Sequence, residues 1–234
     1  MMSLVILCHC GSDDESGCTD HLLTEVKIGD GGYTLYYNDQ GLLSTLETPL
    51  DDVIMHYDLE YNSSGQLTRV TGSNPPAEFS YGEDGKLIKI TDYKADLAID
   101  LQYTYEYDDS GRLIKINVFG SDMDELLSFR IISYPDSETL AISTYSVIDA
   151  ENSELATTMI YTMDNKLRPY PDEWYLVIAS WGQDVLPYNF TQSELFVDGS
   201  LLFSESNTYT YNSAGYPVTQ NDIQYIYACD PPAR

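Results

Sequence analysis

The sequence is short of basic side chains: 11 Lys and Arg stand against 38 Asp and Glu, which gives a formal net charge of −27. A chain of this charge repels phosphate backbones and anionic lipid headgroups, so we expect no nucleic-acid partner. The acidic residues occur in short clusters beside Ser, Asn or Gly, which predicts solvated turns. The cluster Asp122–Glu125 is the nearest approach to a calcium loop, but it lacks the glycine and the distal glutamate of an EF-hand.

Sequence motifs for catalysis are missing as well. The chain has three His and no Gly-x-Ser-x-Gly elbow, phosphate-binding loop, His-rich metal motif or Cys–His nucleophile pair. Two carboxylates can hydrolyse a glycoside, but among 38 acids some close pairs arise by chance. We therefore predict a protein that is not an enzyme and uses no cofactor. A carboxylate pair with a raised pKa in a deep cleft would argue for catalysis instead.

The chain also has few cysteines and a short apolar start. The run Leu4–Leu7 is too short to cross a bilayer and has no basic residues before it. Cys8 and Cys10 flank a His, but with two further His and no second cysteine pair we expect no metal site. In an oxidising compartment Cys18 and Cys229 could form a disulfide that joins the two ends of the chain.

Tyrosine is what the sequence has in excess, with 21 Tyr against six Phe and two Trp. Several of these tyrosines open a repeated pattern: Tyr, usually Asn or Asp, two polar residues, Gly, any residue and usually Leu. An Asn or Asp can open a type I turn, and a Gly with positive φ closes it into a hairpin with a bulge. Asn tolerates the same backbone region. The expected turn-forming residues are Gly41, Gly65, Gly85, Gly111, Asn165 and Gly215.

The segments between these tips alternate apolar and polar residues, as half-buried strands do. Consecutive hairpins with short connections predict an all-β fold, an antiparallel meander of repeated hairpins forming a curled sheet or barrel. We expect one such domain over residues 21–234. A membrane barrel needs a uniformly apolar outer band and usually ends in an aromatic residue, whereas this chain ends in Arg234. The fold is therefore expected to be soluble rather than membrane-spanning.

The hairpin tips resemble the YD repeats of wall-associated and Rhs-type proteins. Nearly the whole chain resembles Bacteroidetes lipoproteins of unknown function with a porin-like fold, through Cys10–Asp14, the passage Tyr161–Pro169 and the closing Tyr209–Cys229. This resemblance implies that residues 1–20 are a residual lipoprotein signal and acidic tether, lipidated at Cys10 or alternatively Cys8. It also implies a lipid anchor as the sole membrane contact, at the outer membrane, facing the cell surface or alternatively the periplasm. The family has no established activity, so no catalytic residue carries over.

The segment Leu167–Phe190 departs from the repeat, and it holds both tryptophans. One reading is an exposed platform that stacks on sugar rings, and the alternative is an inward plug of the barrel. We expect a non-catalytic binding module for a glycan or another surface ligand. The alternative is a structural or protein-interaction role that uses a sheet edge or a Tyr-rich face, which an exposed, unpaired edge strand would favour. The candidate platform residues are Trp174, Trp181, Tyr170 and Tyr175.

Overall fold

The structure is a computed structural model, and almost all of the chain that it describes is β-strand. It describes residues 22–29, 31–50, 53–72, 75–149, 151–164, 166, 168–170, 176 and 189–228. Within those ranges no helix is long and apolar enough to cross a membrane. The strands, in chain order, are β1 (Leu22–Ile28), β2 (Gly31–Tyr37), β3 (Leu43–Leu50), β4 (Val53–Tyr61), β5 (Leu67–Gly72), β6 (Ala77–Tyr81), β7 (Leu87–Tyr93), β8 (Ile99–Tyr107), β9 (Leu113–Phe119), β10 (Leu126–Ser133), β11 (Thr139–Val147), β12 (Ser153–Met163), β13 (Phe190–Val197), β14 (Ser200–Ser206), β15 (Tyr209–Tyr211), β16 (Pro217–Gln220) and β17 (Ile223–Ala228).

Each strand from β1 to β13 pairs antiparallel with the next strand of the chain. This arrangement confirms the predicted all-β meander of hairpins. β1 also pairs with β17, so that Leu22 lies opposite Ala228. β17 pairs in turn with β16, and β16 with β15. In space the strands therefore follow the order β15, β16, β17, β1, β2 and onward to β14. The first and last strands of the chain pair with each other within this row, and neither lies at its edge.

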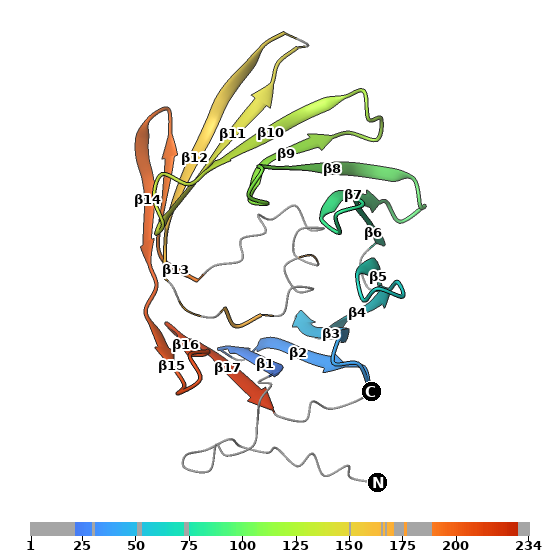
Figure 1. The fold of residues 1–234 in the computed structure, drawn as a ribbon, viewed down its shortest axis with the longest axis vertical. Helices are drawn as coiled ribbons and strands as arrows, with labels where there is room; N and C mark the ends of the chain where they lie inside the picture. The colour runs from blue at the N-terminus through green and yellow to red at the C-terminus, as the bar shows by residue number, and fades with distance from the viewer. Residues whose placement is uncertain are drawn as a thin grey trace.

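The 17-stranded sheet curls into an open ring, because twisted strands placed side by side accumulate curvature (Figure 1). Among the described residues no ladder joins β14 to β15, although they are separated only by Asn207 and Thr208. Of the two architectures that the hairpin pattern allows, the protein adopts the curled sheet, open between β14 and β15.

The inward face of the sheet carries a continuous hydrophobic core. On β8, Tyr103 and Tyr105 are buried in this core, whereas Glu106 points the other way and is exposed, as the alternation of the sequence predicts. Leu46 on β3 and Ile90 on β7 are completely buried on the same face. Burial of such large side chains is the main favourable contribution to folding, at about 1.5–3 kcal/mol each.

The repeated pattern forms the tips of the hairpins. In the first tip, the side-chain oxygen of Asn38 accepts hydrogen bonds from the backbone N–H groups of Gln40 and Leu42, at 2.9 and 3.0 Å. Gly41 donates its N–H to the carbonyl of Asn38 and has a φ of +76°, a region that favours glycine. Asn165 lies outside the described residues, and positive φ recurs at Gly65, Gly85, Gly111 and Gly215.

The tyrosine that opens a tip fastens its hairpin to the preceding one. Its hydroxyl donates a hydrogen bond to the backbone carbonyl of the leucine two residues beyond the previous tip glycine. We call this series the tyrosine ladder, and its bonds join Tyr61 to Leu43, Tyr81 to Leu67, Tyr107 to Leu87 and Tyr134 to Leu113. The ladder gives each tyrosine hydroxyl a structural role, because it satisfies a carbonyl of the neighbouring hairpin. These hydroxyl groups therefore donate their hydrogen bonds within the protein and not to a ligand.

We expect Tyr81→Phe to lower the free energy of unfolding by about 1–2 kcal/mol, because the half-buried carbonyl of Leu67 loses its 2.8 Å donor. Urea denaturation monitored by circular dichroism measures this loss. The matched control is Tyr93→Phe, since the hydroxyl of Tyr93 bonds the carboxylate of Glu78 at an exposed position. The control should change stability by less than about 0.5 kcal/mol. Equal losses in the two variants would contradict a stabilising ladder.

Candidate binding sites

The aromatic platform expected from the sequence is represented by one described residue. Trp174, Trp181 and Tyr175 lie outside the described residues, whereas Tyr170 is described and packs against the core. The ring of Tyr170 meets the ring of Tyr225 edge-on, with centroids 5.6 Å apart. Burial raises the pKa of Tyr170 to about 12. Tyr170 is thus a packing residue rather than a ring exposed for stacking.

Side-chain contacts fasten the chain on either side of the break between β14 and β15. The hydroxyl of Tyr211, on β15, donates a hydrogen bond to the carboxylate of Asp164, just beyond the end of β12. The amide of Asn189 donates to the same carboxylate at 3.2 Å. The backbone N–H of Asn207 bonds the carbonyl of Thr191 on β13. The bond of Tyr211 therefore ties β15 to the end of β12, the bond of Asn189 joins the end of β12 to the start of β13, and the bond of Asn207 ties the linker after β14 to β13.

β14 is an edge strand that is exposed on both faces. All of its residues are exposed, including Leu201 at 54%, Leu202 at 68% and Phe203 at 47%. Its ladder to β13 skips Leu202, which forms a bulge opposite the step from Leu195 to Phe196. No second ladder forms on its other side within the described part of the chain. A free edge with three large apolar side chains in a row is the kind of surface that pairs with another strand.

A local sequence signal for this strand exists, but it is not part of the tyrosine repeat. Asp198 and Gly199 separate two runs that contain large apolar residues, and both have positive φ, at 50° and 73°. An Asp-Gly pair with this backbone is the two-residue hairpin turn that best matches the twist of the strands. The turn predicts β14 itself, but not that β14 would lie at the edge of the sheet.

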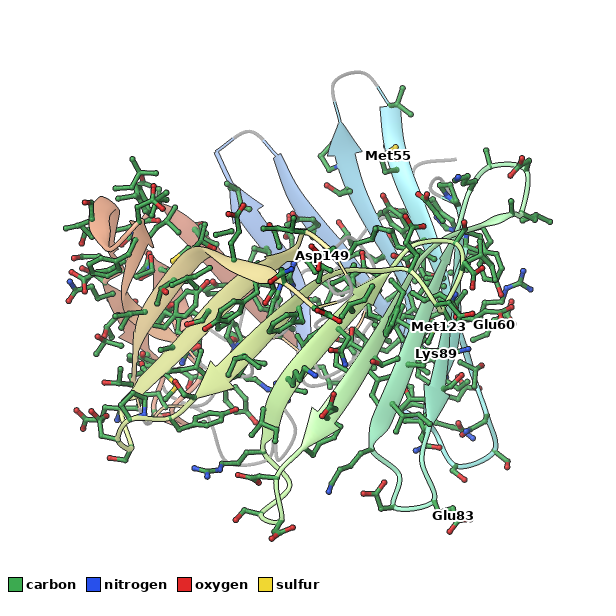
Figure 2. The ribbon with its side chains drawn as sticks, turned by 90° about the horizontal axis from the view of Figure 1, so that it is seen from above. Met55, Glu60, Glu83, Lys89, Met123 and Asp149 are labelled. Atoms are coloured by element: carbon green, nitrogen blue, oxygen red, sulfur yellow. The ribbon has the colours of Figure 1, made fainter. Side chains whose placement is uncertain are left out.

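A cleft of about 330 Å³ lies where β5, β7 and β8 reach the rim opposite the hairpin tips. In Figure 2, Glu83 marks the β6–β7 tip at one end of the strands, and Met55 lies toward the opposite end. None of the described lining residues is basic. The residues of this rim cleft that define its chemistry are Tyr57, Val70, Asp92, Asp100, Leu101 and Tyr103.

Asp92 is the unusual member of this rim cleft. Its Oδ1 atom is buried and has no hydrogen-bond partner among the described residues. The hydroxyl of Tyr103 is hydrogen-bonded to the same side chain. Loss of solvent raises the pKa of the Asp92 carboxyl to about 7, with repulsion from Asp100 as the second cause. Burial, together with the nearby Asp92 carboxylate, raises the pKa of Tyr103 to about 12.

Asp92 meets part of the condition that would argue for catalysis, namely a carboxylate pair with raised pKa in a cleft. The second carboxylate, Asp100, is exposed and lies 3.6 Å from the ammonium of Lys94. A general acid–base pair needs both carboxyl groups to face the same bound substrate. The arrangement is therefore better suited to holding a ligand through one desolvated carboxylate than to hydrolysis.

The inward position of Asp92 could not be read from simple alternation. Beyond the β6–β7 tip, Tyr81 pairs with Leu87 but Ser80 pairs with Lys89, so Ile88 is an extra residue. This bulge changes which residues of β7 face inward. It places Ile90 and Asp92 on the inner side, whereas alternation counted from Leu87 would place them outside.

Comparisons with known proteins support the fold alone. No family model and no curated protein matches the chain. The crystal structure of a porin-like protein from Bacteroides uniformis is similar with a TM-score of 0.59 at 17% identity, over 88% of this chain and 95% of that one. A porin-like protein from Bacteroides vulgatus gives a TM-score of 0.53 at 14% identity, over 89% of this chain and 99% of that one. The all-β architecture is therefore shared with porin-like Bacteroides proteins, as the resemblance implied, while the YD-repeat kinship and the lipid anchor stay predictions.

Proposed function

We propose that the chain is a non-catalytic binding protein of the bacterial envelope, which holds an extended segment of a partner protein along β14. The observation that carries this proposal is the exposed edge of β14, whose described neighbours supply one ladder and no second one. A partner segment that pairs with this edge would gain main-chain hydrogen bonds and would cover the apolar side chains beside it. The edge strand was the feature expected to favour a protein-interaction role over a glycan platform.

The negative net charge of the protein indicates which kind of partner segment can bind to β14. The chain carries a formal charge of −27, so a second copy of the same chain is repelled and a basic segment is attracted. Glu205, on β14, and Asp198, in the turn before it, are exposed beside the apolar residues. The partner segment therefore combines large apolar residues with Lys or Arg, in an extended conformation.

The envelope location is part of the same proposal. Cys10, with Cys8 as the alternative, is the lipidation site that would hold the protein at the outer membrane through its lipid alone. Both cysteines lie outside the described residues. The surface-exposed orientation is favoured by the acidic residues Asp13, Asp14 and Glu15 after Cys10, and the periplasmic face is the alternative.

Site-specific photo-crosslinking in the cells that make the protein tests the docking edge. A photoreactive residue at position 202 should give a discrete adduct, and the same residue at the exposed tip position 109 should not. After the adduct is identified and its protein purified, hydrogen exchange should slow at the β14 amides in the complex. Ser204→Pro, which puts a residue without an N–H in the edge strand, should weaken the complex at least tenfold. Equal adducts at both positions, or unchanged exchange on β14, would refute strand addition.

A glycan platform built from Trp174, Trp181 and Tyr175 is the alternative function. Against it stands Tyr170, the fourth residue of that platform, which packs against Tyr225 instead. Trp fluorescence during titration with a panel of glycans separates the two proposals. A saturable shift that disappears in Trp174→Ala or Trp181→Ala would favour the platform.

A further inference from the structure

We propose that the rim cleft between β5, β7 and β8 is a binding site for an organic cation, a primary ammonium group on a short alkyl chain. The cleft is separate from β14, so this site is independent of the docking edge. Its volume of about 330 Å³ is within the range of small-molecule sites, and its walls are mostly apolar or aromatic with a few polar groups.

The Oδ1 atom of Asp92 is buried and accepts no hydrogen bond from the described residues. Tyr103 already bonds this carboxyl group, and no described residue donates to Oδ1. A carboxyl group with an unpaired oxygen destabilises the folded state, so a ligand that donates to the Asp92 side chain from the cleft that it lines should bind favourably. An ammonium group supplies the donor and the opposite charge together.

The other residues of the cleft favour a cation over an anion. Asp100 adds a second negative charge, and none of the described lining residues is basic. Lys94 approaches Asp100 but does not line the cleft. Tyr57 and Tyr103 contribute aromatic side chains to the lining, a residue type that attracts an ammonium, while Val70 and Leu101 contribute apolar lining for its alkyl chain. A metal ion fits less well, because no three His, Cys, Asp or Glu side chains converge in the described part of the protein.

Binding should depend on pH through Asp92. Burial raises the pKa of this carboxyl to about 7, and a cation binds the ionised form. The charged and titratable groups that act on it are Asp100, Tyr103 and Tyr105 from β8, with Arg130 from β10 acting on both tyrosines. Affinity should therefore rise about tenfold between pH 6 and pH 8, as the ionised fraction increases.

Titration with n-butylammonium tests the site, with n-butanol as the neutral probe of the same length. Followed by NMR of the Asp carboxyl carbons at pH 8, the ammonium should shift Asp92 saturably, and the alcohol should not. Asp92→Asn should weaken binding, measured at the Tyr103 ring signals, at least tenfold. Asp109→Asn, at an exposed tip residue, removes the same charge and should leave binding unchanged.

Three results would overturn the proposal. Butanol could bind as tightly as butylammonium, which would make the site a neutral pocket. Both Asp→Asn variants could lose affinity equally, which would make the attraction a property of the net charge. Asp92→Asn could bind as the parent does, which would remove Asp92 from the site. Circular dichroism of each variant shows that the sheet is intact before the titrations are compared.

Discussion

Asp92→Asn should make the protein more stable than the parent, by an amount that grows between pH 5 and pH 8. The folded chain holds the proton of Asp92 to a pKa of about 7, whereas the ordinary value is 3.8. A group whose pKa is raised by folding contributes stability that is fully present below its unfolded pKa and is lost as the pH rises through its folded pKa. Between pH 5 and pH 8 the parent should therefore lose about 2–3 kcal/mol that the Asn variant keeps.

The measurement is the free energy of unfolding in urea at pH 5, 6, 7 and 8, for the parent, Asp92→Asn and Asp109→Asn. The series starts at pH 5 because the pI of about 4.1 favours precipitation at lower pH. The difference between Asp92→Asn and the parent should grow with pH, and Asp109→Asn, which removes the same charge at an exposed tip, is the reference for it. Two parallel profiles would mean that Asp92 is not desolvated in the folded chain.

The same measurement separates Asp92 from carboxylates that shift in the opposite direction. Hydrogen bonds from backbone N–H groups lower the pKa of the turn residues Asp84 and Asp108, and the side-chain amide of Asn152, followed by backbone N–H groups, lowers the pKa of Asp149. Their contribution is present above the unfolded pKa and is lost as the pH falls through their lowered values. They therefore act below about pH 4, outside the window in which Asp92 titrates.

The hairpin tips could be predicted from the sequence because their interactions are local. The hydrogen bonds that define the first tip all lie between Asn38 and Leu42, so five residues contain the whole physical argument. The antiparallel meander follows from those tips, since each short connection places consecutive strands side by side. The pairing of β1 with β17 could not be predicted in this way, because Leu22 and Ala228 are joined by nearly the whole chain.

The candidate sites depend on interactions that the pattern does not contain. Asp92 faces inward because of the bulge at Ile88, and its desolvation comes from residues of other strands. The exposure of β14 follows from where the sheet opens, which local propensity does not specify. Tyr81 illustrates the difference. The sequence pattern predicts that Tyr81 lies at a hairpin tip, but it does not predict the hydrogen bond to Leu67, which joins two different hairpins. A sequence motif therefore identified the repeated unit, and contacts between units determined which residues stayed available for binding.

Gly72→Ala should be the most damaging single methyl addition near the rim cleft, at about 3–5 kcal/mol of stability. A Cβ at this position would lie 2.0 Å from the carbonyl oxygen of His56 and 2.9 Å from its carbonyl carbon. The φ of +132° is also strained for any residue with a side chain. Both clashing atoms belong to the backbone of β4, so no rotation of a side chain can relieve the contact.

The matched control is Gly41→Ala, which also adds a methyl group at positive φ, +76°, but meets no atom within 4 Å. It should cost about 1–2 kcal/mol from backbone strain alone, so the difference between the two variants isolates the contact with β4. Gly72 lies opposite Tyr57, which lines the cleft, so Gly72→Ala should also speed hydrogen exchange along β4 and β5. Urea denaturation and amide exchange measure the two effects. Equal losses in the two alanine variants would show that the strands separate easily at Gly72, and that the close approach of β4 and β5 does not hold the cleft in shape.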